Sequence, residues 1–341
     1  MVRLATAGAA VALLSAVASG LAANAEAPSF DCTKAATAAE KIVCGDHELS
    51  QADAKMAAAY ARLKRTETPE SFATVQESQR KWLAYLTASC KANGPLPAEE
   101  PKRAAIKDCL TDDHADRADR LHAIQVVKAG ALALEPRMRF FSRPNSHTSD
   151  SDIYPWMSGG HQAAAFNAHV CKTLGLDKRR IDDENLFAFT NLPADMTLYA
   201  RRTYSVARFD ARVVSLQIQT YDYTGGAHEV IGEASLNWDV TKARPLALSE
   251  MFAKPWRKFI TDYCMQDLHR QFAARGASGP DRSAVTSVIA DRKSWLFAKD
   301  HATVHFTVYS IASFADGEFD VEIPYKVLQP YLRPDAPVLS P

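Results

Sequence analysis

The residues of this sequence with the clearest chemical potential are six cysteines. They are Cys32, Cys44, Cys90, Cys109, Cys171 and Cys264. A cysteine can act as a nucleophile, bind a metal ion or form a disulfide. No two of these cysteines have C-x-x-C spacing, and no cysteine and histidine group has the spacing of a zinc site. We therefore expect disulfides, no metal site and no cofactor.

Catalytic motifs are missing from the sequence. Neither the G-x-S-x-G motif of serine hydrolases nor the H-E-x-x-H motif of metalloproteases occurs, and the histidines are scattered. A glycosidase needs two carboxylates across a cleft, and the sequence pairs none of Asp222, Glu229 and Glu233. We therefore predict that the protein is not an enzyme and has no catalytic residues.

One short segment combines aromatic residues, glycines and a histidine. It contains Tyr221, Tyr223, Gly225, Gly226 and His228, between two predicted strands. Glycine lets a backbone approach a ligand closely, and histidine donates or accepts a hydrogen bond near neutral pH. A simpler interpretation is a hairpin turn whose histidine bonds the adjacent strand. These five residues are the candidate binding residues.

The first residues have the features of a secretory signal peptide, predicted over residues 1–25. Arg3 supplies a positive charge, the run from Leu4 to Leu21 is mostly apolar, and Ala23-Asn24-Ala25 resembles a cleavage site. We therefore expect a periplasmic or secreted protein, in which an even number of cysteines favours disulfides. Charges interrupt every later hydrophobic stretch, so we expect no membrane span in the mature protein.

The charges of the chain are balanced. Lysine and arginine together number 40, as do aspartate and glutamate, so no net field attracts nucleic acid or an anionic membrane. We therefore exclude nucleic acid as a partner. A local acidic group could meet a basic partner, but such a run is usually the solvated face of a helix. Its members are Asp112, Asp113, Asp116 and Asp119.

The elements that position the first four cysteines have helical periodicity. Apolar residues between positions 49 and 63 recur three or four apart, which places them on one face of a helix. Thr68 and Pro69 predict the start of a second helix. A third helix is expected after the glycine and proline residues at 94–97. Residues 29–128 should therefore form a small helical bundle.

The pairing of the four cysteines in this bundle stays open, because four cysteines allow three connectivities. If the first two helices form an antiparallel hairpin, Cys44 lies near Cys90, and Cys32 is left to pair with Cys109. We favour this nested pairing. Cys171 and Cys264 fall on two predicted helices of the second domain, where export favours a disulfide over two buried thiols.

The first domain resembles the N-terminal domain of the LprI-type lysozyme inhibitors. The resemblance rests on the four cysteines, on Glu40 to Cys44, on Gln79-Arg80-Lys81-Trp82-Leu83 and on Arg117. It implies secretion and the binding of lysozyme or another cell-wall hydrolase. Trp82 and Tyr60 lie on apolar helix faces, and such residues belong to the core more often than to a contact surface.

Residues 153–332 change from helical to alternating periodicity. The segments 214–218, 234–240 and 319–323 alternate apolar and polar residues, as half-buried strands do. Helices over 161–174 and 256–276 should cover the sheet, and the polar stretch within 129–152 is interpreted as a linker. The expected fold class is α+β: a small disulfide-linked helical bundle followed by an antiparallel sheet covered by helices.

This second domain is similar to the extracytoplasmic domain shared by RsiV and PdaC proteins. The similarity rests on Tyr221 to His228, Leu246 to Phe252 and Tyr309 to Gly317. The sequence departs from the pattern at Lys242-Ala243-Arg244, where a glycine turn is usual. RsiV-like domains can act as lysozyme receptors, so the resemblance implies the same class of partner.

Three functions follow from these features. The first is an exported, non-catalytic protein that binds or inhibits lysozyme in the cell envelope. The second is a peptidoglycan or glycan-binding module, with Tyr221, Tyr223 or Trp156 as stacking surfaces. The third is an envelope scaffold for protein interactions. Complex formation with lysozymes and sedimentation with cell-wall sacculi would separate them.

Overall fold

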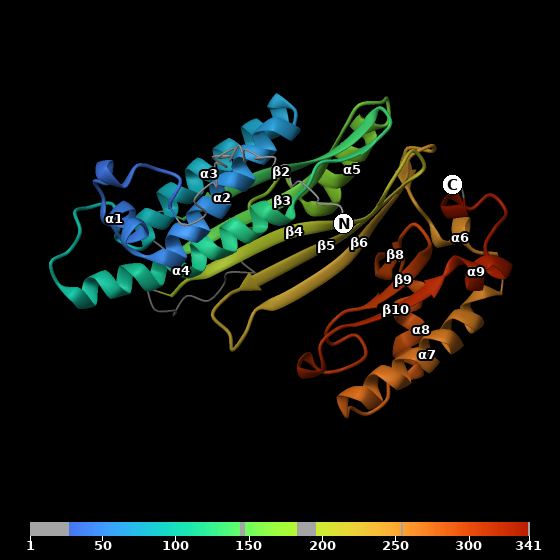
Figure 1. The fold of residues 1–341 in the computed structure, drawn as a ribbon. Helices are drawn as coiled ribbons and strands as arrows, with labels where there is room; N and C mark the ends of the chain where they lie inside the picture. The colour runs from blue at the N-terminus through green and yellow to red at the C-terminus, as the bar shows by residue number, and fades with distance from the viewer. Residues whose placement is uncertain (1–26, 144–146, 183–195, 254, 340–341) are drawn as a thin grey trace, which may run out of the picture.

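A computed structural model describes residues 27–143, 147–182, 196–253 and 255–339. The predicted signal peptide lies outside these residues. In them, no helix is both long and apolar enough to cross a membrane. The chain forms a helical bundle, a large sheet, and a small sheet with its own helices (Figure 1). The expected α+β class and the order of its parts are confirmed.

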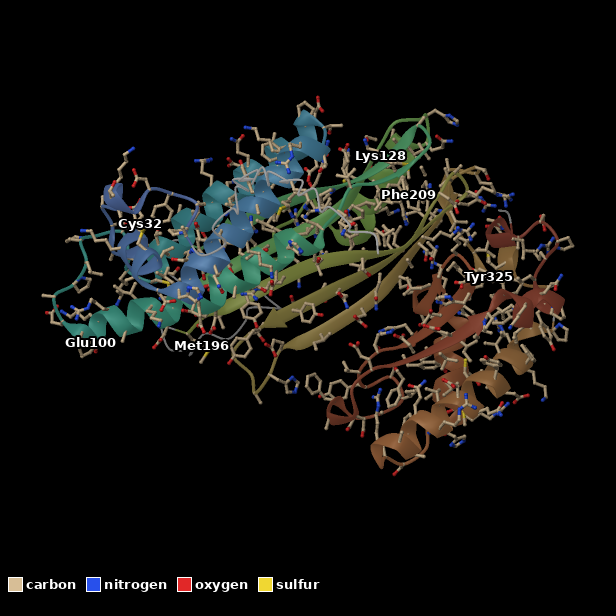
Figure 2. The ribbon with its side chains drawn as sticks, viewed as in Figure 1. Cys32, Glu100, Lys128, Met196, Phe209 and Tyr325 are labelled. Atoms are coloured by element: carbon tan, nitrogen blue, oxygen red, sulfur yellow. A yellow bond between two sulfur atoms is a disulfide. The ribbon has the colours of Figure 1, made fainter. Side chains whose placement is uncertain are left out.

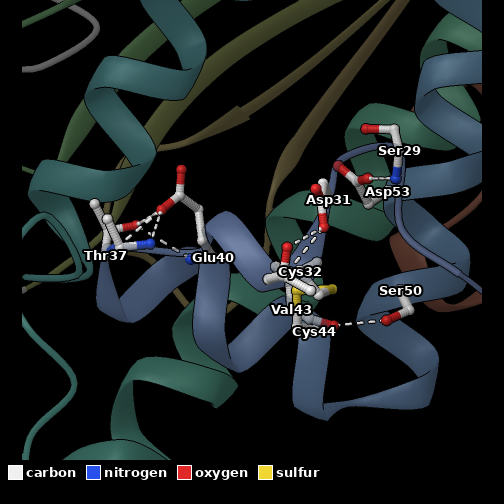
Figure 3. Close-up of a disulfide and its surroundings, with 11 residues drawn as sticks. Ser29, Asp31, Cys32, Thr37, Glu40, Val43, Cys44, Ser50 and Asp53 are labelled. Atoms are coloured by element: carbon white, nitrogen blue, oxygen red, sulfur yellow. Dashed lines mark hydrogen bonds between the residues drawn. A yellow bond between two sulfur atoms is a disulfide. The ribbon is translucent and has the colours of Figure 1, made fainter.

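The N-terminal bundle contains the three predicted helices and a short additional one. After the 3-10 turn η1 (Cys32–Lys34) come α1 (Ala38–Gly45), α2 (His47–Thr66), α3 (Pro69–Ser89) and α4 (Glu100–Ala123). The predicted start of α3 is confirmed, since the Thr68 side chain accepts a hydrogen bond from the Ser71 N–H and Pro69 is the first helical residue. The unpredicted α1 begins with a capping box of Thr37 and Glu40 (Figure 3).

Each of the two disulfides joins one cysteine to the next cysteine along the sequence, so the nested pairing is wrong. Cys32 bonds Cys44 and Cys90 bonds Cys109, with Cα separations of 5.8 and 5.6 Å. Figure 3 shows the first bond closing η1 onto α1. The physical reason is local: α1 turns the chain back beside η1, and α4 runs back beside the end of α3.

The remaining two cysteines are free thiols, so the predicted disulfide between them is also wrong. Cys171 lies on α5 (Ala163–Leu174), which packs on the large sheet, whereas Cys264 lies on α7 (Trp256–Arg275), in the core of the small sheet. The two helices thus cover different sheets. Burial raises the pKa of the Cys264 thiol to about 12, as expected for an unreactive core cysteine.

Removal of the second disulfide tests its contribution to stability. Replacing both Cys90 and Cys109 with alanine is expected to lower the free energy of unfolding by about 3 kcal/mol, because the bond closes a 19-residue separation and restricts the unfolded chain. Urea unfolding followed by circular dichroism measures the loss. Cys171→Ser is the control, with an expected change within about 0.5 kcal/mol. Equal losses in the two proteins would contradict the prediction.

A seven-stranded sheet follows the bundle. Its strands, in spatial order, are β1 (Val127–Ala129), β2 (Leu132–Ser142), β3 (Thr148–Ser158), β4 (Leu198–Phe209), β5 (Val213–Tyr223), β6 (Val230–Asp239) and β7 (Arg244–Pro245). Neighbouring strands are antiparallel except β3 and β4, which are parallel because the chain returns through α5. The strands predicted at 214–218 and 234–240 are confirmed as β5 and β6.

The linker predicted over residues 129–152 is wrong. These residues include all of β2 and the first five residues of β3. Asp150 and Asp152 are fully buried there, although their polarity suggested a solvated loop. The turn at Lys242-Ala243-Arg244 keeps its place without a glycine, since Ala243 has a φ of 49° and Asp239 still pairs with Arg244.

The small sheet has its own hydrophobic core. The sheet consists of β8 (Trp295–Phe297), β9 (His301–Phe306) and β10 (Phe319–Pro324). The helices α7 and α8 (Arg282–Ala290) lie beside it. Two short helices, α6 (Leu248–Met251) and α9 (Tyr325–Leu328), complete this part. Fully buried Trp295 packs on Phe252 and Trp256. The predicted C-cap of α7 is confirmed, because Gly276 has a φ of 67°. The predicted strand at 319–323 is β10.

The bundle and the small sheet cover the same face of the large sheet. Arg201 of β4 pairs with Asp116 of α4, and Glu233 of β6 pairs with His305 of β9. Arg201 stands opposite Tyr221, and Gln219 stands opposite Glu233, so the strand alternation places all four on one face. In Figure 2, Phe209 labels the end of β4, and Met196 labels the chain two residues before the strand begins.

A buried carboxyl group lies at the turn between α2 and α3. Both carboxyl oxygens of Glu67 are buried and make no hydrogen bond to the described residues. Burial, followed by repulsion from Glu135, raises the pKa of Glu67 to about 8. Glu135 accepts hydrogen bonds from Thr68 and is 3% exposed, so it cannot turn away into solvent.

Stability should therefore depend on pH through Glu67. Between the ordinary carboxyl pKa of 4.5 and the folded value of about 8, the folded state holds a proton that the unfolded state has released. Stability then falls as pH rises through this range. We expect Glu67→Gln to reduce the fall in melting temperature between about pH 5 and pH 8. The same pH slope in both proteins would show that Glu67 ionises freely in the folded state.

Candidate binding surface

The predicted binding residues lie at the turn between β5 and β6. Tyr221 and Tyr223 end β5, and Gly225, Gly226 and His228 lie in the connection to β6. Gly225 has a φ of 94°, a conformation that a residue with a side chain rarely adopts. A Cβ on Gly226 would meet only the carbonyl oxygen of His228 at 3.7 Å, an ordinary contact. The turn therefore requires glycine at position 225.

His228 reaches across to the small sheet. Its ring stacks on Phe314 with a centroid distance of 3.9 Å and an interplanar angle of 16°. Phe314 belongs to the connection between β9 and β10. The ring Nδ1 atom of His228 lies 2.7 Å from the carbonyl oxygen of Glu229. The histidine therefore bonds the residue next to it and joins the hairpin to the small sheet through its ring.

Tyr309 extends this contact into an exposed aromatic group. Tyr309 is 66% exposed, and its ring centroid lies 5.9 Å from that of Phe314. Tyr309 also has a φ of 65°, which is uncommon for a residue with a side chain. We call His228, Tyr309 and Phe314 the aromatic rim. Exposed aromatic residues in a group are typical of protein-binding surfaces.

Tyr309 and Phe314 were missed as binding residues in the sequence. They lie about eighty positions from His228, and no local pattern indicates that the two segments meet. The signal that could have found them is the resemblance itself, because the segment from Tyr309 to Gly317 carries part of it. Two segments far apart in the sequence can form one surface when a hairpin reaches a neighbouring sheet.

Tyr221 faces a pocket of about 220 Å³ between α4 and the large sheet. The Tyr199 hydroxyl donates a hydrogen bond to Glu229 at 3.0 Å, and the guanidinium carbon of Arg201 lies 4.1 Å from the Tyr199 ring centroid. Burial and the bond to Glu229 raise the pKa of Tyr199 to about 12, so its hydroxyl stays neutral. The lining residues are Asp116, Arg120, Tyr199, Arg201, Arg202, Thr203, Tyr221 and Glu229.

The candidate binding residues are thus divided between two places. Tyr221 lines the pocket, and Tyr223 packs on Tyr199 at 5.9 Å between ring centroids. His228 belongs to the aromatic rim, and the two glycines lie in the turn between these places. Trp156, the other aromatic residue considered, carries the guanidinium of Arg137 over its ring at 3.9 Å.

The acidic group of α4 is partly used within the molecule. Asp116 and Asp113 pair with Arg201 at 3.1 and 3.5 Å, and Asp119 pairs with Lys55. Burial raises the pKa of Asp113. Asp112 remains exposed. The expectation of a solvated face is therefore wrong for Asp113 and Asp116, which join the bundle to the large sheet.

The signature from Gln79 to Leu83 places only Trp82 in the core, because Gln79 is half-buried and Arg80, Lys81 and Leu83 are exposed. Trp82 is 4% exposed and packs against His114 and the Arg117 guanidinium, as predicted for an apolar helix face. Arg117 donates hydrogen bonds to Gln79 at 2.9 Å and to Ser78 at 3.1 Å. Gln79, Trp82 and Arg117 therefore hold α3 against α4.

Family comparisons assign the two ends of the chain separately. Residues 32–121 match the family model described as lysozyme inhibitor LprI, and residues 249–326 match a family of proteins of unknown function, DUF3298. The first match confirms the predicted resemblance of the bundle, and the second is consistent with an RsiV- or PdaC-like domain. The inhibitor match and the two disulfides together indicate an extracytoplasmic protein.

Solved structures of DUF3298 proteins resemble part of this fold. A DUF3298 family protein from Pseudomonas aeruginosa PAO1 is 16% identical, with a TM-score of 0.46 over 61% of this chain and 96% of its own. A DUF3298 member from Bacteroides fragilis NCTC 9343 is 19% identical, with a TM-score of 0.46 over 62% of this chain and 97% of its own. No curated protein matches the chain.

Proposed function

We propose that this protein is an exported, non-catalytic binding protein that binds lysozyme in the cell envelope and inhibits it. The match of residues 32–121 to the lysozyme inhibitor family carries the proposal. The bundle retains two disulfides and a buried Trp82. A match to a family of inhibitors also supports a function without catalysis.

The aromatic rim is the contact surface that we propose for lysozyme. Binding energy in protein interfaces concentrates in a few aromatic or arginine residues that fill pockets on the partner. Tyr309 is exposed, the Phe314 ring lies beside it, and the His228 ring stacks on Phe314. Val230, at the start of β6, adds exposed apolar surface with 61% of its area accessible.

The charge distribution favours the aromatic rim, rather than the acidic group of α4, as the contact surface for lysozyme. A basic lysozyme would be attracted to a free acidic surface, and such binding weakens steeply with salt. Asp113, Asp116 and Asp119 are already paired with Arg201 and Lys55. We therefore expect a complex whose affinity changes less than about tenfold between low and physiological salt.

Purified protein and several types of lysozyme provide the test. Complex formation is measured by calorimetry at two salt concentrations, and inhibition is measured as the rate of cell-wall lysis. Tyr309→Ala should weaken binding about tenfold or more, as the loss of an aromatic anchor does. Leu83→Ala is the matched control, because Leu83 is an exposed apolar residue of the bundle with 41% of its area accessible.

Each outcome of this test decides a separate point. If no lysozyme forms a complex, the proposed function is wrong. If Leu83→Ala weakens binding while Tyr309→Ala does not, the contact surface lies on the bundle and the rim is excluded. Both variants remove exposed side chains, so melting temperatures close to that of the wild type are expected for each.

The pocket at Tyr221 supports a second candidate function, the binding of peptidoglycan. Tyrosine faces beside arginine and carboxylate groups suit a neutral, hydroxyl-rich ligand. Sedimentation with purified sacculi tests this function, with Tyr221→Ala as the pocket variant and Tyr309→Ala as its control. A protein that stays in solution while it still binds lysozyme would remove this alternative.

A further inference from the structure

A buried histidine and three carboxylates meet where the small sheet lies on the large sheet. His305 of β9 is 5% exposed, and the Glu233 side chain of β6 is 2% exposed. Glu318 precedes β10, and Asp320 lies on it. One ring nitrogen of His305 and one oxygen each of Glu233 and Glu318 lie within 4.8 Å of one another. Both sheets thus contribute to one group of potential metal ligands.

Other residues hold the two buried side chains in place. The Nδ1 atom of His305 lies 2.7 Å from Asp320 Oδ1, which directs Nε2 of the same ring toward Glu233. Gln219 donates a hydrogen bond to Oε1 of Glu233, which leaves Oε2 facing His305. In metalloproteins a histidine ligand commonly bonds a carboxylate through its other nitrogen, and ligating carboxylates are hydrogen-bonded as well. The arrangement here has both features.

The two inner atoms are paired with each other. Oε2 of Glu233 and Nε2 of His305 form a buried ion pair, and outside this pair neither atom has a hydrogen bond of normal geometry to the described residues. One atom from each of Glu233, His305 and Glu318 lies within 4.8 Å of the others, a spacing that one bound ion could bridge.

The charges of the group favour a cation. One imidazole faces the carboxylates of Glu233, Glu318 and Asp320, so negative charge exceeds positive charge even when the ring is protonated. A bound divalent cation would balance this excess of negative charge.

We propose that Glu233, His305 and Glu318 bind a divalent transition-metal ion such as Zn²⁺. Asp320 and Gln219 are positioning residues that orient His305 and Glu233. An imidazole nitrogen beside carboxylate oxygens suits Zn²⁺, whereas Ca²⁺ and Mg²⁺ prefer oxygen ligands alone. Because Glu233 belongs to the large sheet and the other two ligands to the small sheet, the ion joins the two sheets. This proposal does not depend on lysozyme binding.

The test uses the metal-stripped protein without a histidine tag, and Zn²⁺ alone as the probe. Calorimetry is expected to show one equivalent of bound Zn²⁺, with a rise in melting temperature that Ca²⁺ and Mg²⁺ at the same concentration do not reproduce. His305→Ala should lower the affinity by more than about 100-fold, and Asp320→Asn by about 10- to 100-fold.

Two further variants keep the test decisive. His301→Ala is the matched control, because His301 lies on the same side of β9 and pairs with Asp300 instead. It should keep the wild-type affinity for Zn²⁺. Glu318→Gln is expected to fold even if His305→Ala does not, because Glu318 is only half-buried, and it should weaken binding at least about tenfold.

Two results would overturn the proposal. The first is a wild-type protein that binds no stoichiometric Zn²⁺, which would leave His305 as part of an ion-pair network. The second is unchanged Zn²⁺ affinity in Glu318→Gln and in a folded His305→Ala, which would place the ion elsewhere, for example at the free thiol of Cys171.

Discussion

Replacing Asp152 with alanine is expected to lower the free energy of unfolding by about 3 to 5 kcal/mol, the usual cost of removing one partner of a buried ion pair. The Asp152 carboxylate is fully buried and lies between two arginines, at 2.5 Å from Arg139 and 3.3 Å from Arg202. Its removal leaves two largely buried guanidinium groups without this counter-charge. Urea unfolding at constant pH measures the loss.

The control for this variant is a carboxylate paired on the surface. Asp182 pairs with Arg179, and their side chains are 47% and 52% exposed. Asp182→Ala should cost less than about 1 kcal/mol, because solvent screens an exposed pair. If Asp152→Ala costs no more than this control, Arg139 and Arg202 find other partners, and the buried pairs do not stabilise β3 in the sheet.

Replacing Trp82 with alanine is expected to cost about 3 to 5 kcal/mol of unfolding free energy, because a large buried aromatic side chain leaves a cavity that the bundle cannot fill. Trp82 packs against His114, with ring centroids 5.4 Å apart, and beneath the Arg117 guanidinium. Its loss would also leave Arg117, which is 1% exposed, without its aromatic neighbour. Thermal and urea unfolding both report this change.

Leu83 provides the comparison for Trp82 on the same helix. It is the next residue in the sequence but is 41% exposed, so Leu83→Ala should change stability by no more than about 0.5 kcal/mol. The difference in stability loss between Trp82→Ala and Leu83→Ala tests whether Trp82 of the inhibitor signature serves to stabilise the fold. A small loss in Trp82→Ala, together with a loss of lysozyme binding, would instead make Trp82 a contact residue.

The bundle and the large sheet share one core, which bears on how the proposed inhibitor works. Tyr85 of α3 packs on Phe140 of β2, with ring centroids 5.5 Å apart, and Arg120 of α4 donates a hydrogen bond to Ser151 of β3. The region that matches the lysozyme inhibitor family is therefore not a freely hinged module. A lysozyme at the aromatic rim would contact the turn between β5 and β6 and the small sheet, while the bundle packs elsewhere on the same large sheet.

Features that depend on residues close in the chain were predictable from the sequence. Thr68 and Pro69 start α3, and Gly276 ends α7, because capping involves atoms within one helical turn. The alternation in β10 was likewise readable, because this strand buries one side against a core. In β5 and β6 the expected single covered face is wrong, because the consecutive residues 213–216 and 236–239 are buried on both sides of the sheet.

The stretch from Ser149 to Asp152 shows where such reading fails. Its polarity predicted a linker, but the fold buries it as part of β3. The arginines that make this burial possible come from β2 and β4, and the nearer of them is 13 residues away. Composition identifies a charge, but only tertiary contacts show whether the charge has a partner.

The cysteines, the starting point of the sequence analysis, show the same division. The sequence by itself determined that a helical, cysteine-rich bundle resembling lysozyme inhibitors precedes an α+β region. Tertiary structure decided that Cys32 meets Cys44, that Cys171 and Cys264 cover different sheets, and that His228 meets Phe314. Periodicity and capping depend on neighbours along the chain, whereas disulfides, buried ion pairs and binding surfaces depend on residues that only folding brings together.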